Sequence, residues 1–569
     1  MKSLTIQVAQ NLHGSPRSTM ESQDGSSDML SDSYFVPPPL EVATMRQQIP
    51  PMMTEISELR SRLEELEDRV YRYRSATSPL RRIPPEILGE IFHVAMGSQA
   101  IDFEGKKDLT VILLVCKKWR DAAYLAGKLW TCISLRLPRT TQMSYEKVSN
   151  WIGRSKGSPK TLKIVYDPDR CFHPTQSFKE CELAVPLLVK LLVEGPLLHR
   201  LEIHFVPSWC FQELMDSVKV HVGHDLTKSS WSQLQELVLR FQGEIDRHNF
   251  GKGEEDVSQS VFRHIPPLRS LTLSFPTDRR GVALTRHIHL PPTSLQTLTN
   301  FHLRCEWDGP QIFVFLQHCQ NLQTLTLTLG VYSYCTWKPK NTNVPFLLAD
   351  PGYIILPNLR TLAIRGCTIQ NAKKLANHIR VPSLLDLRVA QWPYLSGSDD
   401  SVYNALVALS PIWVQTSTLR FLTLEDLQKD SKIYAKELTD ILSRFGNITH
   451  FATSFDFNAK DFLELQKLGD AVRLLPSLEH LEITHIREDF DLESFFQYIE
   501  HRRMLQSNDE GQADRLKMLT LSGQDFLGQV RLQDSQLYWV YQESSYPQLL
   551  KESFGIVVNF LPRGSPIIM

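Results

Sequence analysis

The fold of this 569-residue chain is decided by a short stretch near its middle, Leu322-Gln323-Thr324-Leu325-Thr326-Leu327. Its pattern, Leu-x-x-Leu-x-Leu with occasional Ile or Val, returns eight more times: Leu198-Leu201-Ile203, Leu234-Leu237-Leu239, Leu268-Leu271-Leu273, Leu359-Leu362-Ile364, Leu384-Leu387-Val389, Leu419-Leu422-Leu424, Leu478-Leu481-Ile483 and Leu516-Leu519-Leu521. Weaker copies begin at Leu295 and Ile448, so that successive copies start 25 to 38 residues apart. Because every second residue of Leu-x-Leu is apolar and Thr often stands between, each copy predicts one parallel strand.

The segments between the copies have the apolar spacing of amphipathic helices, for example at 405–409, 438–442 and 495–499. Strand, turn and helix in regular alternation resemble the leucine-rich-repeat solenoid, here with longer and less regular repeats. The resemblance implies an α/β fold, with parallel strands and helices, over residues 196–525. Residues 131–195 would link to it or form a first repeat, and residues 526–569 would form a C-terminal cap or tail. A solenoid made of helices alone is the competing fold.

The composition excludes several classes of function. Lys and Arg number 62 against 63 Asp and Glu, so no overall positive field attracts nucleic acid or an anionic membrane. Apolar runs such as Val111 to Cys116 are far shorter than the ~20 residues that cross a bilayer, and Met1 to Gln10 lacks the features of a secretory signal. Nine cysteines at irregular spacing, with no Cys-x-x-Cys, argue against a disulfide framework or a zinc site, and a lone cysteine such as Cys116 is typical of a buried small residue. We therefore expect a cytoplasmic or nuclear protein.

The N-terminal region has two parts. Residues 1–50, rich in Ser, Asp, Gln and Pro, predict a disordered tail. Residues 54–76 predict a helix, with Thr54 as its N-cap and one heptad-spaced apolar seam formed by Ile56, Leu59, Leu63, Leu66, Val70 and Tyr73. A lone helix of this length is marginal in water, so the seam must either fold back on its own chain or pair in a coiled coil with a second copy.

Residues 80–130 predict a small helical unit. Pro85 and Glu86 suit the first turn of a helix, and the apolar residues that follow share one face. A polar loop is expected from Gly97 to Thr110, before the apolar run at 111–116. A unit this small cannot bury all its apolar side chains against itself.

The order Leu-x-x-Ile-Pro-x-Glu-Ile-Leu-x-x-Ile-Phe from Leu80, then Leu-Val-Cys-x-x-Trp and Leu-Trp, resembles the F-box of fungal, basidiomycete-type F-box-like proteins. The resemblance implies docking onto a Skp-type adaptor and, through it, membership of a cullin-RING ubiquitin ligase. The adaptor-facing residues that it implies are Ile83, Pro84, Pro85, Ile87, Leu88, Ile91, Phe92, Val115, Cys116 and Trp119. The alternative is that these side chains pack onto the following domain.

A solenoid of this kind presents the residues between its strand leucines along one broad recognition surface. The candidate target-binding residues are mixed in chemistry: Arg200, Glu202, His204, Arg240, Asp386, Arg388, Phe421, His480 and Glu482, with Glu236 beside them. No basic stripe is apparent among them. Two long segments, 242–260 and 332–356, interrupt the repeats and are further candidates for partner contacts.

One pattern typical of hydrolases and two histidine pairs are present, but the residues around them do not support a catalytic or metal site. Gly153-Arg154-Ser155-Lys156-Gly157 satisfies Gly-x-Ser-x-Gly, yet a helix is expected before it and a strand after it, the reverse of a nucleophile elbow. His221 with His224 and His287 with His289 lack further ligands at a zinc spacing. We therefore expect no catalytic residue, metal or cofactor.

The sequence thus favours a substrate-recognition subunit of an SCF-type ubiquitin ligase, in which residues 80–130 hold the adaptor and the solenoid holds a protein target. The alternative is a non-catalytic scaffold or self-associating interaction protein that does not bind the adaptor. Both interpretations predict a protein that is not an enzyme.

Overall fold

The computed structural model describes residues 38–97, 103–137, 144–166, 186–222, 229–241, 260–275, 288–305, 310–329, 353–366, 369–391, 402–413, 417–426, 435–454, 459–467, 475–486, 490–507, 515–523, 548, 550–552 and 555–561. Predictions for residues 1–37, and for most of 242–260 and 332–356, lie outside this part of the chain. The chain divides into two compact units, residues 1–84 and residues 85–569.

In the first unit, helix α2 (Pro39–Thr77) is followed by the short 3-10 helix η2 (Pro79–Arg81). The prediction of a disordered tail as far as residue 50 is wrong for residues 39–50, which are helical. Pro39 fits the first turn, where its missing N–H costs no hydrogen bond, and the residues between it and Pro50 are mostly good helix formers.

The N-cap predicted at Thr54 is also wrong, because α2 continues through Pro50 and Pro51. Inside the helix, the Thr54 hydroxyl donates a hydrogen bond of 3.0 Å to the Pro50 carbonyl. Two interior prolines remove two helical N–H donors, and such positions normally kink or end a helix. The predicted boundary between tail and helix rested on the change in composition near these prolines, which does not show that the helix runs through them.

The second unit is built on one parallel sheet of fourteen described strands, whose order in space is their order in the sequence. The strands are β1 (Cys132–Leu137), β2 (Thr161–Tyr166), β3 (Arg200–Val206), β4 (Glu236–Phe241), β5 (Ser270–Ser274), β6 (Asn300–Cys305), β7 (Thr324–Leu329), β9 (Thr361–Arg365), β11 (Asp386–Gln391), β12 (Phe421–Asp426), β13 (His450–Thr453), β14 (His480–Ile486), β15 (Met518–Gly523) and β16 (Val557–Leu561). A separate parallel pair joins β8 (Ile354–Ile355) to β10 (Ile379–Arg380). The predicted α/β class is therefore confirmed, and the all-helical alternative is wrong.

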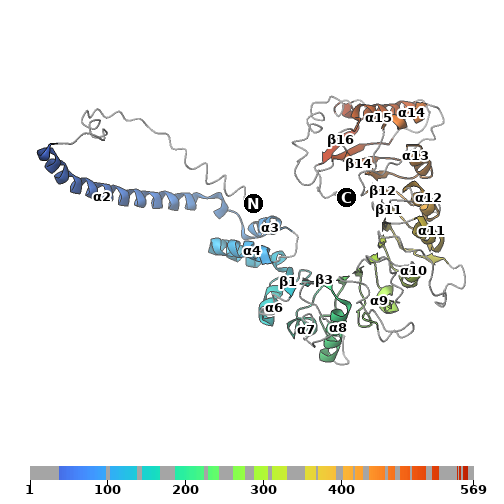
Figure 1. Cartoon of the computed structure of the whole chain (residues 1–569), viewed down its shortest axis with the longest axis horizontal. Helices are drawn as coiled ribbons and strands as arrows, with labels where there is room; N and C mark the ends of the chain where they lie inside the picture. Colours follow the sequence, from blue (N-terminus) through green and yellow to red (C-terminus); the bar gives the residue numbers. More distant parts are fainter. Residues whose placement is uncertain are drawn as a thin grey trace. The chain divides into compact units, whose positions relative to one another are not determined.

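Helices precede and follow these strands along the chain. A helical module comes first, formed by α3 (Pro85–Met96), α4 (Phe103–Val115), α5 (Lys117–Leu125) and η3 (Gly127–Trp130). The later helices lie along one side of the sheet (Figure 1): α6 (Tyr145–Gly153), α7 (Pro186–Val193), α8 (Ser208–Val222), α9 (Pro292–Gln296), α10 (Pro310–Leu316), α11 (Ile369–His378), α12 (Val402–Trp413), α13 (Ala435–Ser443), α14 (Ala459–Lys467) and α15 (Leu492–Ser507). The polar loop expected at 97–110 is wrong from residue 103 onward, where α4 begins.

The repeat leucines line up across the sheet and form its core. Leu325 pairs in register with Phe301 on one side and Leu362 on the other, and all three side chains are buried. One continuous apolar cluster extends from β1 to β15 and includes residues of the later helices. Each repeat thus completes the core of its neighbours, as in a solenoid-like fold.

The sheet is longer than the repeat pattern predicts. Strands β1 and β2 precede the first expected copy, and β16 follows the last one. These strands keep the inner apolar pair, for example Ile133 and Leu135, but lack a leucine at the first position of the pattern. The weak copy assigned to Leu295 is out of register: Phe301 and Leu303 pair with Leu325 and Leu327, so that copy begins at Leu298.

Candidate interaction surfaces

The helical module closes around its own apolar core. Leu88 and Phe92 on α3 are only 1% and 3% exposed, and the Phe92 ring lies 4.9 Å from the ring of Trp119 on α5. At Gly89, α3 approaches the end of α5 so closely that an added Cβ would stand 2.8 Å from the Cβ of Ala126. The face of α3 that carries Leu88, Gly89 and Phe92 is therefore buried within the module.

Several apolar side chains of α3 and α4 remain exposed outside this core. On α3, Ile87 is 52% exposed and Ile91 46% exposed, at the i, i+4 spacing that places them side by side on the helix. We call the whole set the apolar stripe: Ile87, Ile91 and Val94 on α3, with Val111, Leu114 and Val115 on α4. Exposed apolar side chains gathered on a small folded unit are typical of protein contact sites.

The ten predicted adaptor-facing residues fall into three groups. Pro84, Ile87, Ile91, Val115 and Cys116 are exposed, and Ile83, Pro85 and Trp119 are partly buried. Leu88 and Phe92 are in the core, so their prediction as exposed contact residues is wrong. Cys116, expected to be buried, is exposed because it lies at the junction where α4 ends and α5 begins.

Three residues of the apolar stripe were missed, namely Val94, Val111 and Leu114. The signal was available for Val94, which follows Ile91 at the next helical position of the same face. Val111 and Leu114 lie in an apolar run that offers no periodicity from which an exposed side could be chosen.

Trp130 joins the helical module to the sheet. Its indole is fully buried, and its Nε1–H donates a 2.8 Å hydrogen bond to the Ala123 carbonyl on α5. Its ring lies 4.7 Å from the ring of Trp151 on α6, edge to face, and the Arg154 guanidinium lies 4.7 Å from its centre. The module and the first repeat therefore share this residue.

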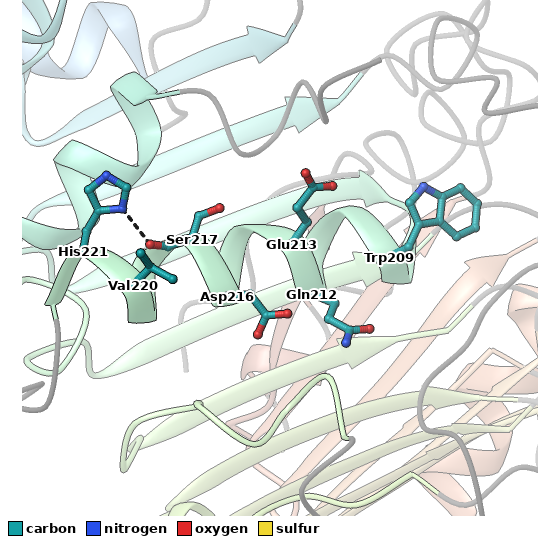
Figure 2. Close-up of a pocket in the computed structure, with 7 residues that line it drawn as sticks. All are labelled: Trp209, Gln212, Glu213, Asp216, Ser217, Val220 and His221. Atoms are coloured by element: carbon teal, nitrogen blue, oxygen red, sulfur yellow. Dashed lines mark hydrogen bonds between the residues drawn. The ribbon is translucent and has the colours of Figure 1, made fainter. Parts of the chain in front are cut away.

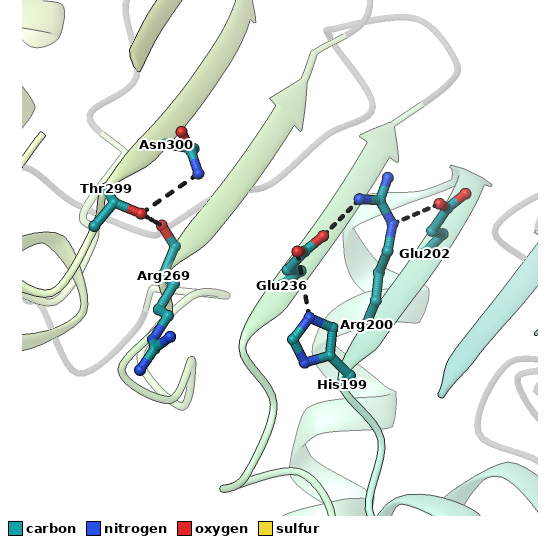
Figure 3. A network of polar contacts seen from close by, with 7 residues as sticks. All are labelled: His199, Arg200, Glu202, Glu236, Arg269, Thr299 and Asn300. Atoms are coloured by element: carbon teal, nitrogen blue, oxygen red, sulfur yellow. Dashed lines mark hydrogen bonds and ion pairs between the residues drawn. The ribbon is translucent and has the colours of Figure 1, made fainter. Parts of the chain in front are cut away.

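The side of the sheet opposite the helices, which we call the open face, carries the residues between the repeat leucines. Near its N-terminal end these residues pair with one another (Figure 3): Arg200 donates to Glu236 at 2.6 Å and to Glu202 at 2.8 Å. His199 lies 3.4 Å from Glu236, and His204 lies 3.1 Å from Glu202. His204 and Arg200 hold the pKa of the Glu202 carboxyl at about 2, so it is ionised at neutral pH.

Further along the open face, Asp386 and Arg388 form another internal pair. The Arg388 guanidinium donates from Nη2 and Nε to Asp386 Oδ2 at 2.8 and 3.0 Å. Four of the predicted target-binding charges, these two with Arg200 and Glu202, are thus already neutralised by a neighbour. Such pairs are poorly placed to attract a partner by charge alone.

The predicted residues Phe421, His480 and Glu482 lie together near the C-terminal end of the open face. The Phe421 ring is 4.5 Å from the His450 ring, which is 5.5 Å from the His480 ring. Burial, and then His450, lower the pKa of His480 to about 4, and burial raises the pKa of Glu482. At neutral pH this cluster is mainly aromatic and uncharged at both histidines.

A shallow hollow lies on the surface of α8. Its lining side chains all come from this one helix (Figure 2): Trp209, Gln212, Glu213, Asp216, Ser217, Val220 and His221. Asp216 pairs with Arg263, and His221 Nδ1 lies 2.8 Å from the Ser217 carbonyl. Polar groups do not converge from several elements, as they do in most ligand sites.

The Gly-x-Ser-x-Gly motif is structural. Helix α6 precedes it and β2 follows it, as expected, and the fully buried Ser155 hydroxyl donates 2.7 Å to the Ile152 carbonyl. In the described part of the chain, no group of three or more His, Cys, Asp or Glu residues could hold a metal ion. None of the described helices has both the length and the apolar character needed to span a bilayer.

No protein-family model matches the chain, and no curated protein matches it.

Proposed function

We propose that the protein is the substrate-recognition subunit of an SCF-type cullin-RING ubiquitin ligase. In this proposal the helical module is an F-box that docks onto a Skp-type adaptor, and the sheet with its helices is a leucine-rich-repeat solenoid that binds a protein target. The observation that carries the proposal is the apolar stripe, which stays exposed although the module already has a closed core. The F-box-like order of residues supplies the identity of the partner.

The size of the apolar stripe is adequate for such a contact. Burying one side chain of this kind is worth roughly 1.5–3 kcal/mol. Six of them therefore offset the several kcal/mol that association costs in lost freedom of motion. The protein itself would catalyse nothing, and would act by raising the effective concentration of a target lysine near the ubiquitin-loaded partner.

The test is adaptor binding by the full chain carrying Ile87→Asp and Ile91→Asp. Two carboxylates in the stripe would have to be desolvated on docking, so we expect the affinity for a Skp-type adaptor to fall at least about 100-fold. Isothermal titration calorimetry or co-purification measures the loss. Both residues are exposed, so the melting temperature is expected to stay close to that of the wild type.

Lys147→Asp is the matched control, because it introduces the same side chain at an exposed position of α6, outside the module. It is expected to leave adaptor affinity within about twofold. The proposal fails if the intact protein does not bind the adaptor, or if the stripe variant binds as well as the control. Substitution of Leu88 or Phe92 is unsuitable, because loss of the core would abolish binding for any function of the module.

A second candidate, a self-associating interaction protein, is favoured by α2. Its six seam side chains are 41% to 66% exposed: Ile56, Leu59, Leu63, Leu66, Val70 and Tyr73. Flanking charges are held within the helix, where Arg69 pairs with Glu65 at 3.0 Å. An apolar heptad seam with neutralised flanks is suited to a two-stranded coiled coil.

Light scattering of the full chain tests this second candidate. We expect the mass of a dimer for the wild type and of a monomer for Leu59→Asp with Leu63→Asp, because each charge would meet its own copy across the seam. The control is Ser57→Asp with Ser61→Asp, at positions of α2 outside the seam. A wild-type monomer at about 100 µM would reject self-association as the role of α2.

A further inference from the structure

Strand register builds a row of basic residues on the open face. Arg240 on β4 pairs with Ser274 on β5, which pairs with Arg304 on β6. Arg304 pairs in turn with Thr328 on β7, which pairs with Arg365 on β9. Arginine thus stands on every second strand, with a small hydroxyl residue between. Neighbouring strands are about 4.8 Å apart, so the three arginine backbones are spaced at about 10 Å. We call these three arginines the basic row.

The guanidinium groups of the basic row are free to bind. All three residues are exposed, and none of the three guanidiniums has a hydrogen-bond or ion-pair partner among the residues that the structure describes. Arg200 and Arg388, on the same face, each bind a carboxylate of the chain itself. The basic row is therefore a part of the open face where, among the described residues, positive charge is uncompensated.

The residues beside the basic row add no negative charge. The adjoining open-face positions, two residues earlier on the same strands, are Val238, Thr272, His302, Thr326 and Ala363. Burial and then the charges of Arg365, Arg240 and Arg304 lower the pKa of His302. The positive charges of all three arginines therefore lower the pKa of one imidazole, that of His302, which is neutral at pH 7.

We propose that the basic row docks an acidic, extended segment of a partner protein, with one carboxylate facing each arginine. Guanidinium groups bind carboxylates through paired hydrogen bonds. In a polyproline II segment, every third side chain returns to the same side after about 9.3 Å, which matches the spacing of the row. Ser274, which is partly exposed, offers a hydroxyl donor between Arg240 and Arg304, whereas Thr328, between Arg304 and Arg365, is buried and only keeps the spacing. This assignment rests on the proposed function, since it names the chemistry of the target that the solenoid would hold.

The experiment is a fluorescence anisotropy titration of the full chain with a labelled Glu-Pro-Pro repeat peptide. A Gln-Pro-Pro peptide of the same length is the neutral control, and a single-stranded oligonucleotide of equal charge tests for indiscriminate anion binding. We expect the Glu peptide to bind at least about tenfold more tightly than both, and to weaken as salt is raised from about 0.05 to 0.5 M. Equal binding of the Glu and Gln peptides, or tighter binding of the oligonucleotide, overturns the proposal.

Two variants locate the site. Arg304→Glu, in the centre of the row, is expected to weaken the Glu peptide at least about tenfold, because it replaces an attraction with a repulsion. Arg360→Glu is the matched control, an exposed arginine just before β9 whose charge lies at the other end of that strand from Arg365. It is expected to change affinity less than twofold, and equal losses in both variants would overturn the assignment.

Failure of adaptor docking and failure of acidic-peptide binding give different experimental results. Peptide binding requires no adaptor, so the variant with Ile87→Asp and Ile91→Asp should bind the Glu peptide as the wild type does. If that variant loses the adaptor and keeps the peptide, both proposals stand. If the wild type binds the adaptor but not the Glu peptide, the basic row is rejected and the adaptor-docking proposal survives.

Discussion

Replacement of Trp130 by alanine is expected to lower the free energy of unfolding by about 3–5 kcal/mol, the range for deleting a large aromatic side chain from a core. Its indole is fully buried between α5 and α6, in ring contact with Trp151 at 4.7 Å and Tyr124 at 5.6 Å. The cavity would open where the helical module meets the first strand. The variant is therefore expected to loosen the module while the distant repeats keep their structure, because each repeat depends mainly on its neighbours.

Hydrogen exchange is the measurement that separates local from global loss. Protection should fall in α3, α5 and β1 of Trp130→Ala and remain near wild type from β9 to β15. Trp130→Phe is the control, because it keeps one aromatic ring in place while it removes the 2.8 Å hydrogen bond to the Ala123 carbonyl and part of the buried indole volume. That change should cost less than the alanine substitution, because the cavity is smaller. A loss below about 1 kcal/mol in the alanine variant would contradict the joining role of Trp130.

The repeat leucines made most of the sheet predictable from the sequence. In a parallel sheet buried on one side, a leucine that faces the core must recur at the same position of every strand, so spacing alone fixes strand and register. The spacing gives no signal for a strand where the first position of the Leu-x-x-Leu-x-Leu pattern is not a leucine. Trp130 takes that position before β1, Pro159 before β2 and Gly555 before β16. Strands β1 and β16 were therefore missed, and β2 was expected only as the strand after Gly157, not as a copy of the repeat.

The candidate surfaces were less predictable, for two physical reasons. Ile87, Leu88, Ile91 and Phe92 are equally apolar, and only the approach of α5 decides which pair is covered and which is exposed. The basic row depends on strand register between residues that are far apart in the sequence. Arg304 and Arg365 each directly follow the last apolar residue of a copy, a position at which the repeat pattern itself specifies no residue type.

Substitution of Leu325 by aspartate is expected to have the largest effect on the sheet. This side chain is fully buried in β7, in register with Phe301 and Leu362 on the flanking strands. Removing the leucine costs about 2–5 kcal/mol, and an unpaired carboxylate in the same place adds several more. We expect a total loss above about 5 kcal/mol, with β7 and its contacts to both neighbouring repeats affected first.

The neighbouring substitution Thr326→Asp provides the contrast, because its side chain lies on the open face of the same strand, near the charges of the basic row. A carboxylate there should change the free energy of unfolding by less than about 1 kcal/mol. In Leu325→Asp, by contrast, neither flanking strand can pair with a folded β7, so denaturant unfolding should split into two transitions and limited proteolysis should cut within 310–366. If the two variants melt together in one transition, the leucines do not form the continuous core through which neighbouring repeats stabilise each other.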